Sequence, residues 1–336
     1  MQPSPPTVRP YERPLRPPWW ARGGHAQTIL SHFAPMAAPE IGTPADRRLE
    51  VELEDGDRLV GFAREGSGPR RGTRVHLFHG LSGDANADYM RRIAAGLVAD
   101  GHDIWALNHR GCGAGAGMAE GIYHSGRSED MAAVLAASHA EAPGLTHLVV
   151  GFSLSGNIGL QLLAEARTPL PAGVISINPP ADLEATSRRI QTGLSQLYER
   201  RFVRRLRRAV VSRARERDEV PPHIPRGSSL WDLDELVTAP RGGFADARDY
   251  YARCSTLGRL GEITRPAVIL TARDDPFVAA EMFEDAPRPA NVHLHVEETG
   301  GHVGYLEARG LGYGCWLTGA VVHYVAELAR LAEPGA

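Results

Sequence analysis

Short apolar runs alternate along much of the chain with segments whose apolar residues recur at helical spacing. The runs predict buried strands, and the segments between them predict helices. The expected strands are 75–78, 104–107, 148–150, 174–177, 267–271 and 291–296. The expected helices are 89–99, 128–140, 157–165 and 316–331. This alternation predicts an α/β fold with a mostly parallel central sheet and helices on both of its faces.

Two regions depart from this alternation. Residues 48–53 and 58–63 alternate apolar and polar positions around an Asp-Gly turn, which predicts an antiparallel hairpin at the start of the fold. Residues 181–260 contain no pattern typical of a buried strand. Within them, 187–217 combines eleven arginines with apolar residues near helical spacing, which predicts one basic amphipathic helix.

These patterns divide the chain into three parts. Residues 1–18 are rich in proline and are expected to lie extended on the surface or to be disordered. Residues 19–180 and 261–336 are expected to form the α/β core. Residues 181–260 are expected to form a helical cap, whose apolar stripe covers the site while its arginines face water. A contact of 187–217 with an anionic membrane surface or an acidic substrate stays open as an alternative.

Composition and charge exclude several classes of protein. The 336 residues are 43% hydrophobic, which is enough for a sizeable core, and the net charge of −3 gives no sign of a nucleic-acid partner. Three widely spaced cysteines suit a reducing cytosol better than a disulfide framework. The fourteen histidines form no metal-binding motif, so we expect no metal and no cofactor. Without a membrane span or signal peptide, a cytoplasmic protein is expected.

The strand at 148–150 leads into a turn with a serine at its apex. Residues 151–156 read Gly-Phe-Ser-Leu-Ser-Gly between this strand and a helix. So tight a turn strains the backbone of Ser153 and lifts its hydroxyl clear of the sheet. Gly151 is small enough for the close approach of strand and helix, and Ser155 stands where a second glycine is usual. A chance match in a glycine-rich chain is the alternative interpretation.

Two later loops carry groups that would activate this serine. Asp275 follows the strand at 267–271, and His302 follows the strand at 291–296. Carboxyl ends of parallel strands meet at one edge of a sheet, and the order Ser, Asp, His is that of α/β-hydrolases. We therefore predict Ser153 as the nucleophile, His302 as its base and Asp275 as the acid that orients the imidazole.

Asp274 competes with Asp275 for the acid role. We favour Asp275 because it immediately precedes Pro276 at the turn of the loop. Each residue also has a simpler interpretation, the aspartates as a capped turn and His302 as an ordinary loop histidine.

A loop after the first buried strand is expected to complete the site. The backbone N–H groups of Leu81 and Leu154 would hold the negative charge that develops on a carbonyl oxygen during acyl transfer. His79 is expected to brace this loop. The glycine-rich residues 111–117 fail the spacing of a dinucleotide-binding motif, and no helix starts directly after them, so we predict no nucleotide site.

The segment after the proline-rich start carries Trp19 and Trp20 side by side. Because two tryptophans are costly to leave in water, we expect this segment to dock on the domain. His25 follows closely, and we favour a structural role for it over a role in the site.

Taken together, the motifs resemble those of the YheT-like branch of the α/β-hydrolases, which includes mammalian membrane-bound esterases. The matching stretches are 18–22, 24–28, 79–83, 110–113, 123–126, 151–157, 243–246, 249–251, 274–277 and 300–304. The resemblance implies a serine hydrolase acting on carboxylic esters, with Ser153, Asp275 and His302 as the triad. It also implies that the insertion after Pro180 covers the site.

Two departures from this family pattern stand out. Ser155 replaces the usual glycine, which we expect to be tolerated. The N-terminal membrane anchor of the mammalian relatives is not found in this sequence, so a soluble protein is implied. The expected partner is a small-molecule ester or a lipid-like substrate, with no nucleic acid.

We expect an esterase that works through an acyl-enzyme. An acyltransferase or thioesterase using the same triad stays open, as does a non-catalytic scaffold that binds through 187–217, although an intact triad argues against the scaffold. The sequence gives neither the acyl-chain length nor the oligomeric state.

Overall fold

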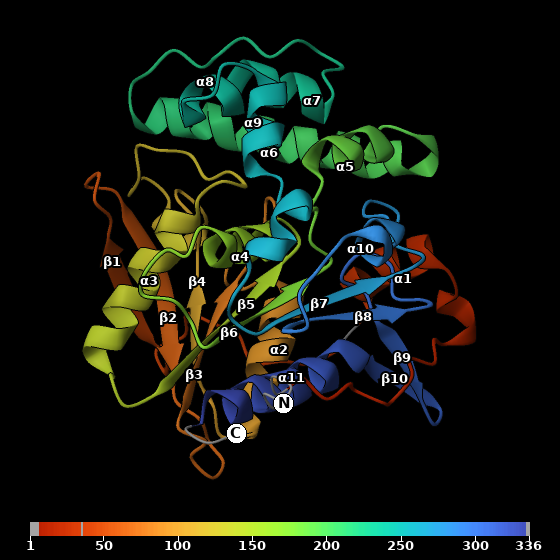
Figure 1. Ribbon diagram of the computed structural model, residues 1–336. Helices are drawn as coiled ribbons and strands as arrows, with labels where there is room; N and C mark the ends of the chain where they lie inside the picture. Colours follow the sequence, from red (N-terminus) through yellow and green to blue (C-terminus); the bar gives the residue numbers. More distant parts are fainter. Residues whose placement is uncertain (1–6, 35, 334–336) are drawn as a thin grey trace.

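Eight strands form one sheet in the computed structural model, which describes residues 7–34 and 36–333 (Figure 1). Their spatial order is β1-β2-β4-β3-β5-β6-β7-β8. The pairs β1–β2 and β2–β4 are antiparallel and all other pairs are parallel, so only β2 runs against the rest. The mostly parallel sheet predicted from the sequence is confirmed.

The strands fall within two residues of their predicted positions. They are β1 (Arg47–Glu52), β2 (Arg58–Arg64), β3 (Thr73–Phe78), β4 (Asp103–Leu107), β5 (Thr146–Phe152), β6 (Gly173–Ile177), β7 (Ala267–Ala272) and β8 (Val292–Glu297). Every residue of β3, β6 and β7 is buried, because helices cover both faces of the sheet. Strands in such a setting read as continuous apolar runs rather than as alternating ones.

Two pairs of helices cover the sheet, one pair on each face. One core lies under α2 (Asp88–Ala99) and α11 (Trp316–Ala332), and the other under α3 (Ser128–Glu141) and α4 (Leu154–Ala164). All four correspond to helices predicted from apolar spacing. The sequence did not predict η1 (Trp19–Ala21), α1 (Gly24–Phe33), η2 (Gly113–Gly115), α10 (Glu281–Asp285) or the hairpin of β9 (Leu306–Arg309) and β10 (Gly312–Cys315). These elements are short or lack an apolar period.

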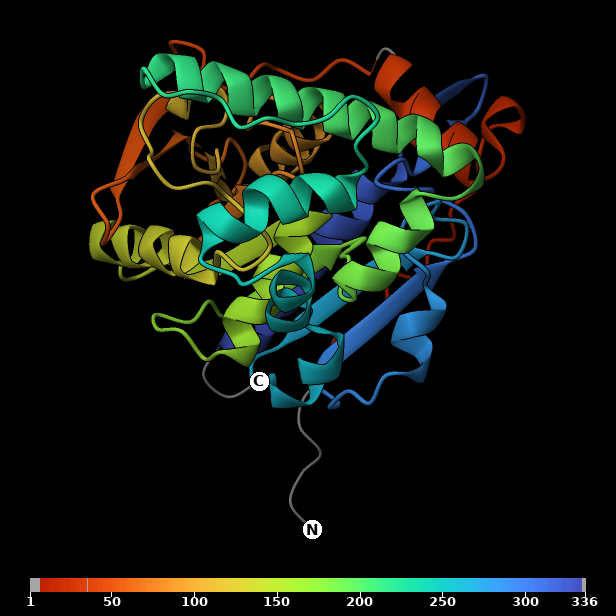
Figure 2. The same ribbon diagram turned by 90° about the horizontal axis from the view of Figure 1, so that it is seen from above.

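Between β6 and β7, the chain is helical and lies over the carboxyl edge of the sheet (Figures 1 and 2). We call residues 181–260 the cap segment. The helices after β6 are α5 (Leu183–Ile190), η3 (Gly193–Ser195), α6 (Gln196–Glu216), α7 (Leu230–Leu233), η4 (Asp234–Thr238), α8 (Ala239–Gly242), α9 (Ala247–Cys254) and η5 (Leu257–Glu262).

The prediction of a single basic helix over 187–217 is wrong, because the chain breaks between α5 and α6. Gly193 has a φ of +54°, in the left-handed region that glycine enters without a steric cost. Thr192 before it is extended, with φ −114° and ψ 150°. Two of the eleven arginines therefore lie on α5 and eight on α6, and Arg217 directly follows α6.

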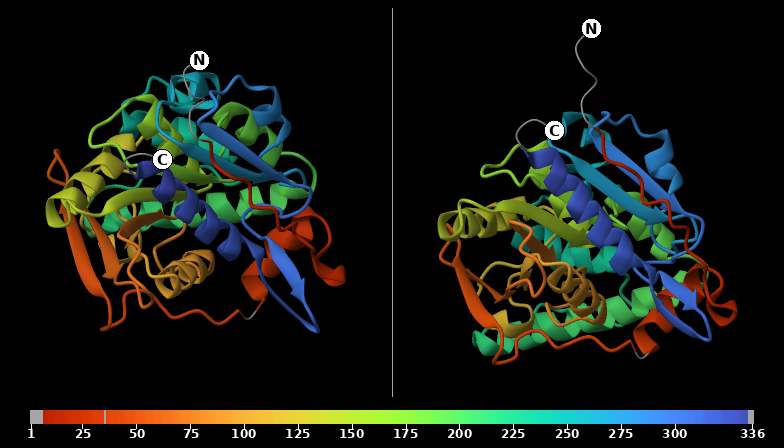
Figure 3. Two further views of the ribbon diagram at one scale, coloured as in Figure 1. Left: turned by 60° about the horizontal axis from the view of Figure 1, so that its bottom comes forward. Right: turned by 90° about the horizontal axis from the view of Figure 1, so that it is seen from below.

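Residues 7–18 lie extended against the core, and Figure 3 shows this N-terminal segment from below. Its buried apolar side chains are Val8 and Leu15. The Arg9 guanidinium pairs with Glu327 of α11 at 2.8 Å. The remainder of the predicted proline-rich segment, residues 1–6, lies outside the described residues.

The segment with Trp19 and Trp20 docks on the domain as expected, since Ala21, Gln27 and Thr28 are buried, but the Trp19 ring itself is 81% exposed. Trp20 contacts Tyr313 of β10 edge-on, with ring centroids 5.4 Å apart. The segment is held instead by the buried amide of Gln27, which donates to the carbonyl oxygen of Ala21 at 2.8 Å and accepts from the N–H of Leu306 at 2.6 Å. Because the hydrogen bonds of Gln27 hold the segment, its docking does not require burial of the Trp19 ring.

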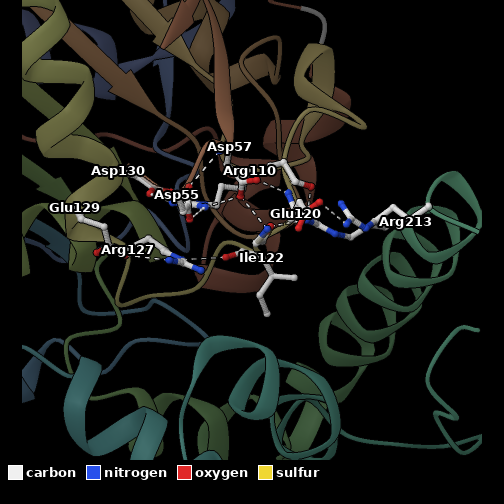
Figure 4. A network of polar contacts seen from close by, with 12 residues as sticks. Asp55, Asp57, Arg110, Glu120, Ile122, Arg127, Glu129, Asp130 and Arg213 are labelled. Carbon is white, nitrogen blue, oxygen red and sulfur yellow. Dashed lines mark hydrogen bonds and ion pairs between the residues drawn. The ribbon is translucent and has the colours of Figure 1, made fainter. Parts of the chain in front are cut away.

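A buried ionic cluster joins the β1–β2 turn to α3 (Figure 4). Arg110 binds Asp130 of α3 in a bidentate manner, at 2.7 and 2.8 Å, and also bonds Asp57 in the turn at 2.5 Å. All three side chains are buried. From α6, Arg213 donates to carbonyl oxygens at Ala119 and Gly121 of the same loop region, which ties the cap segment to the core.

Replacing Arg110 by methionine should lower the free energy of unfolding by roughly 3–5 kcal/mol, because two buried carboxylates would lose their cation. Urea denaturation of the Arg110→Met protein measures this loss. The control is Arg47→Met, which removes an exposed ion pair with Glu141 and should cost no more than about 1 kcal/mol. Equal effects of the two substitutions would contradict the assignment of the Arg110 cluster as a structural anchor.

Candidate active site

Ser153 lies at the apex of the turn between β5 and α4. Its φ and ψ are 52° and −119°, and such a conformation costs a non-glycine residue about 1–3 kcal/mol. The Ser153 N–H donates to the carbonyl oxygen of Ile177 at 2.8 Å, which anchors the turn to β6. A Cβ on Gly151 would lie 2.3 Å from the carbonyl oxygen of Ser155, so only glycine fits there. The turn presents the serine hydroxyl to the cap segment.

The structure brings Ser153, His302 and Asp275 together in one hydrogen-bonded row. Ser153 Oγ lies 2.8 Å from His302 Nε2, and His302 Nδ1 lies 2.8 Å from Asp275 Oδ2. The three residues come from the loops after β5, β8 and β7. When Nδ1–H donates to the carboxylate, the lone pair of Nε2 faces the serine hydroxyl and can take its proton.

Asp275 is fully buried, and donors surround its carboxylate. Oδ1 accepts from the N–H groups of Phe277 at 2.7 Å and Val278 at 3.1 Å. Oδ2 accepts from the side-chain amide of Asn178 at 2.7 Å in addition to the imidazole. A buried carboxylate keeps its charge only with such bonds, so this one is equipped to stabilise an imidazolium beside it.

Asp274 does not contact His302 as Asp275 does, but binds the loop that carries it. Its Oδ1 accepts from the N–H of Gly301 and its Oδ2 from the hydroxyl of Thr299, both at 2.8 Å. Asp274 therefore shapes the loop that carries His302, while Asp275 faces the imidazole itself.

Two residues that support this row were missed by the sequence analysis. Asn178, at the end of β6, accepts from the Tyr305 hydroxyl at 3.0 Å while its amide holds Asp275. Thr28 of α1 accepts from the N–H of His302 at 2.8 Å. Two signals in the sequence point to them, an asparagine directly after a buried strand and the 24–28 stretch, which matches the family pattern.

Helix α1 packs unusually closely against both loops of the site. A Cβ on Gly24 would lie 1.6 Å from the carbonyl oxygen of Asp274, and one on Gly301 would lie 2.4 Å from the carbonyl oxygen of Gly24. His25 does not join the row. Its ring stacks on Tyr198 of α6, with centroids 5.7 Å apart, so it links α1 to the cap segment.

The backbone N–H groups of Leu81 and Leu154 remain available beside the serine. Both residues line the same pocket as Ser153 and His302. Within residues 7–34 and 36–333, neither N–H donates to another protein group. Donors in this position suit an oxygen that becomes negatively charged next to the serine.

His79 braces the loop of Leu81 and is held in one tautomer. Its Nδ1–H donates to the carbonyl oxygen of Gly80 at 2.8 Å, and its Nε2 accepts from the N–H of His109 at 3.2 Å. Burial lowers the pKa of His79 to about 4, so the ring is neutral near pH 7. Ser155, in the usual glycine position, donates to the carbonyl oxygen of His79 and so ties the serine turn to this loop.

The pocket beside Ser153 is mostly apolar and is roofed by the cap segment. Its lining includes Leu183 and Ile190 of α5, Phe202 and Leu206 of α6, and Phe277. Aliphatic and aromatic walls of this kind suit a hydrocarbon chain.

One buried carboxyl interrupts this apolar lining. Asp234 accepts from the hydroxyls of Tyr251 and Thr238, both at 2.7 Å. Burial raises its pKa to about 6. The mostly apolar lining therefore includes one buried carboxyl, a feature that the sequence analysis did not predict.

In the part of the chain that the structure describes, no group of three or more His, Cys, Asp or Glu side chains is arranged to hold a metal ion. The three cysteines, Cys112, Cys254 and Cys315, are free thiols. No helix within residues 7–34 and 36–333 is both long enough and apolar enough to cross a bilayer.

Comparison with known proteins agrees with this architecture. A family model described as the alpha/beta hydrolase fold matches residues 73–309. The chain therefore belongs to the α/β-hydrolase fold family.

The relatives place the chain more narrowly. YheT of Escherichia coli (strain K12), named as a candidate esterase, is 30% identical over 303 residues, which cover 87% of each chain. The monoacylglycerol lipase of Saccharomyces cerevisiae is 28% identical over 86% of this chain and 65% of its own. A Pyrococcus furiosus esterase structure, 17% identical, superposes with a TM-score of 0.53 over 88% of this chain and 91% of its own. The protein is thus a YheT-like α/β-hydrolase with esterase- and lipase-like relatives, and the predicted resemblance is confirmed.

The raised pKa of Asp234 makes a testable contribution to stability. The pKa of Asp234 is about 6 in the folded protein, above the ordinary value of 3.8. The protonated carboxyl therefore contributes its full stability below pH 3.8, and this contribution is lost as the pH rises through 6. The resulting penalty is roughly 1.5 kcal/mol at pH 5 and on the order of 3 kcal/mol at pH 8. The free energy of unfolding of Asp234→Asn, relative to that of the wild type, should therefore rise by about 1.5 kcal/mol when the pH is raised from 5 to 8. Urea denaturation at the two pH values measures this change. A difference that does not change with pH would contradict the buried charge.

Proposed function

We propose that the protein is a carboxylic ester hydrolase that acts through an acyl-enzyme on Ser153. The observation that carries this proposal is the row Ser153–His302–Asp275, with 2.8 Å at each contact. The row opens into the apolar pocket under the cap segment. The names of relatives, among them a monoacylglycerol lipase, support an ester with an acyl chain as the substrate.

In the proposed reaction, Ser153 Oγ attacks the ester carbonyl carbon while its proton passes to His302 Nε2. Asp275 stabilises the imidazolium that forms. The N–H groups of Leu81 and Leu154 hold the carbonyl oxygen as it becomes negative, and each such donor is worth roughly 2.7–4 kcal/mol in related sites. His302 then gives its proton to the leaving alcohol. Water, activated by the same imidazole, releases the acid from Ser153.

The apolar lining favours the acyl group as the part of the substrate that enters the pocket. Phe202 and Leu206 present their side chains to it from α6, and Ile190 does so from α5. These apolar walls lower the local dielectric, which strengthens the electrostatic interactions at Ser153 during attack. A thioesterase or an acyltransferase would use the same groups with a different leaving group or acceptor.

Ser153→Ala should lower kcat for a p-nitrophenyl ester on the order of 10⁴- to 10⁶-fold and abolish labelling by a fluorophosphonate probe. The matched control is Ser67→Ala, at an exposed serine far from the pocket, which should keep both activity and labelling. Unchanged turnover in the Ser153 variant would disprove the proposal. Product analysis with added alcohol separates hydrolysis from acyl transfer, since only a transferase forms the new ester as its main product.

Asn178→Ala should lower kcat by roughly 10- to 100-fold with little change in KM, because Asp275 loses a charge-assisted hydrogen bond while the pocket lining is unaltered. Tyr305→Phe is the matched control, since it removes a partner of Asn178 but leaves the bond to Asp275. Steady-state kinetics, with circular dichroism to verify folding, measures both. A change in KM alone would mean that Asn178 contacts substrate instead.

A further inference from the structure

Most exposed large apolar side chains gather on two neighbouring parts of the chain. Nine such residues are found in residues 7–34 and 36–333. Six of them lie on η1, on α1 and around the start of α6, with exposures from 36% to 81%. We call these six the apolar patch: Trp19, Trp20, Ile29, Phe33, Leu194 and Leu197. Isolated exposed apolar residues are ordinary, but a cluster of this kind marks a contact surface.

The two parts that carry the apolar patch are in contact. His25 of α1 stacks on Tyr198 of α6, and the His25 ring nitrogen lies 3.1 Å from the tyrosine hydroxyl. Ile29 follows His25 by one helical turn, and Leu197 immediately precedes Tyr198. Figures 2 and 3 both show α1 beside the N-terminal half of α6. The apolar patch is therefore one region of the surface.

Helix α6 continues this region with a face of arginines. Its inward side chains, Phe202 and Leu206, line the pocket, while seven arginines are exposed on the other side. We call these seven the arginine row: Arg200, Arg201, Arg204, Arg205, Arg207, Arg208 and Arg215. At 100° per residue, all seven and Leu197 project within less than half of the helix circumference.

The positive charge of the arginine row is not neutralised within the described part of the chain. None of its members forms an ion pair there, whereas the nearby Arg188 and Arg217 pair with Glu184 and Glu120. The pKa of Arg205 is lowered, first by burial and then by the charge of Arg201, so the row repels itself. An external anionic surface would relieve this repulsion. The charge is local, since the whole chain has a net charge of −3.

We propose that the apolar patch and the arginine row together form a docking face for the surface of an anionic phospholipid bilayer. The tryptophans, Phe33 and the leucines enter the headgroup region, and the arginines pair with lipid phosphates. Tryptophan beside aliphatic side chains, with arginine along the polar face, is the composition of helices that lie in a bilayer interface. A nucleic acid would pair with the arginines but would leave the apolar patch in water.

This face and the pocket share one helix. One side of α6 carries the arginine row, and the opposite side forms part of the pocket lining. Docking would therefore hold α6, which roofs the pocket, against the lipid. The link to the substrate rests on the proposed esterase function, whereas bilayer binding itself does not.

The test is flotation of the Ser153→Ala protein with phosphatidylcholine vesicles, with and without phosphatidylserine. The inactive background keeps the lipid intact, so binding is measured whether or not the protein is an esterase. We expect binding to phosphatidylserine vesicles at least about tenfold tighter than to neutral ones, weakened by added salt. Tryptophan emission should shift to shorter wavelength on binding, and the shift should disappear in Trp19→Phe with Trp20→Phe.

Two sets of substitutions examine the two components. Changing four arginines of the arginine row to Gln should weaken binding by roughly 100-fold or more, at about fivefold for each arginine. The four are Arg200, Arg201, Arg204 and Arg205. The matched control changes Arg48, Arg58, Arg70 and Arg71 to Gln, which alters the net charge equally at exposed sites elsewhere and should leave binding within about threefold. Phe33→Ser with Leu197→Ser should weaken binding by about tenfold or more.

Three results would overturn the proposal. The first is no binding of the parent protein to phosphatidylserine vesicles, and the second is full binding by the quadruple arginine variant. The third is full vesicle binding by the Phe33 and Leu197 variant together with equally tight binding of RNA, which would make this face a general polyanion site. Thermal unfolding verifies that each variant is folded.

Discussion

A carboxylate without contact to water must be surrounded by donors, and the site depends on how Asp275 meets this requirement. Its partners come from its own loop, from Asn178 after β6 and from His302 after β8. These bonds fix the distance between neighbouring strand ends and turn the imidazole toward Ser153. In the proposed reaction, the strained turn positions the Ser153 hydroxyl, and the imidazole held by Asp275 takes the proton of that hydroxyl.

The cap segment completes the pocket beside this arrangement. Its helices α5 and α6 supply apolar walls to the pocket beside Ser153, and the Asp234 carboxyl lies among them. A buried carboxyl of this kind is costly, and the hydroxyls of Tyr251 and Thr238 supply the hydrogen bonds that offset part of this cost. The break at Gly193 lets α5 and α6 present different sides to the pocket, which one continuous helix could not do.

The elements that were predictable are those with local signals. Buried strands read as apolar runs, and Ser153, Asp275 and His302 follow such strands, so their nomination needed only the rule that parallel strand ends meet. Asn178 also directly follows a buried strand, so the same rule could have nominated it, whereas Thr28 lies in α1, away from any strand end, and supports a residue 274 positions away. The exposure of Trp19 was missed for a related reason: the polar bonds of Gln27, which anchor its segment, have no periodic signature. The helix break depended on the backbone angles of a single glycine.

The placement of α1 has a consequence for how the protein reaches its active form in the cell. Thr28 of α1 accepts from the N–H of His302, and the backbone carbonyl oxygen of Arg13, ahead of α1, accepts from the indole N–H of Trp316 at 2.7 Å. Segments that are synthesised first therefore depend on partners that are synthesised last. A ribosome that has delivered the sheet through β7 has not yet delivered these partners. In the proposed reaction, Ser153 therefore gains its base only after nearly the whole chain has emerged, and a product truncated before His302 would carry the serine without that base.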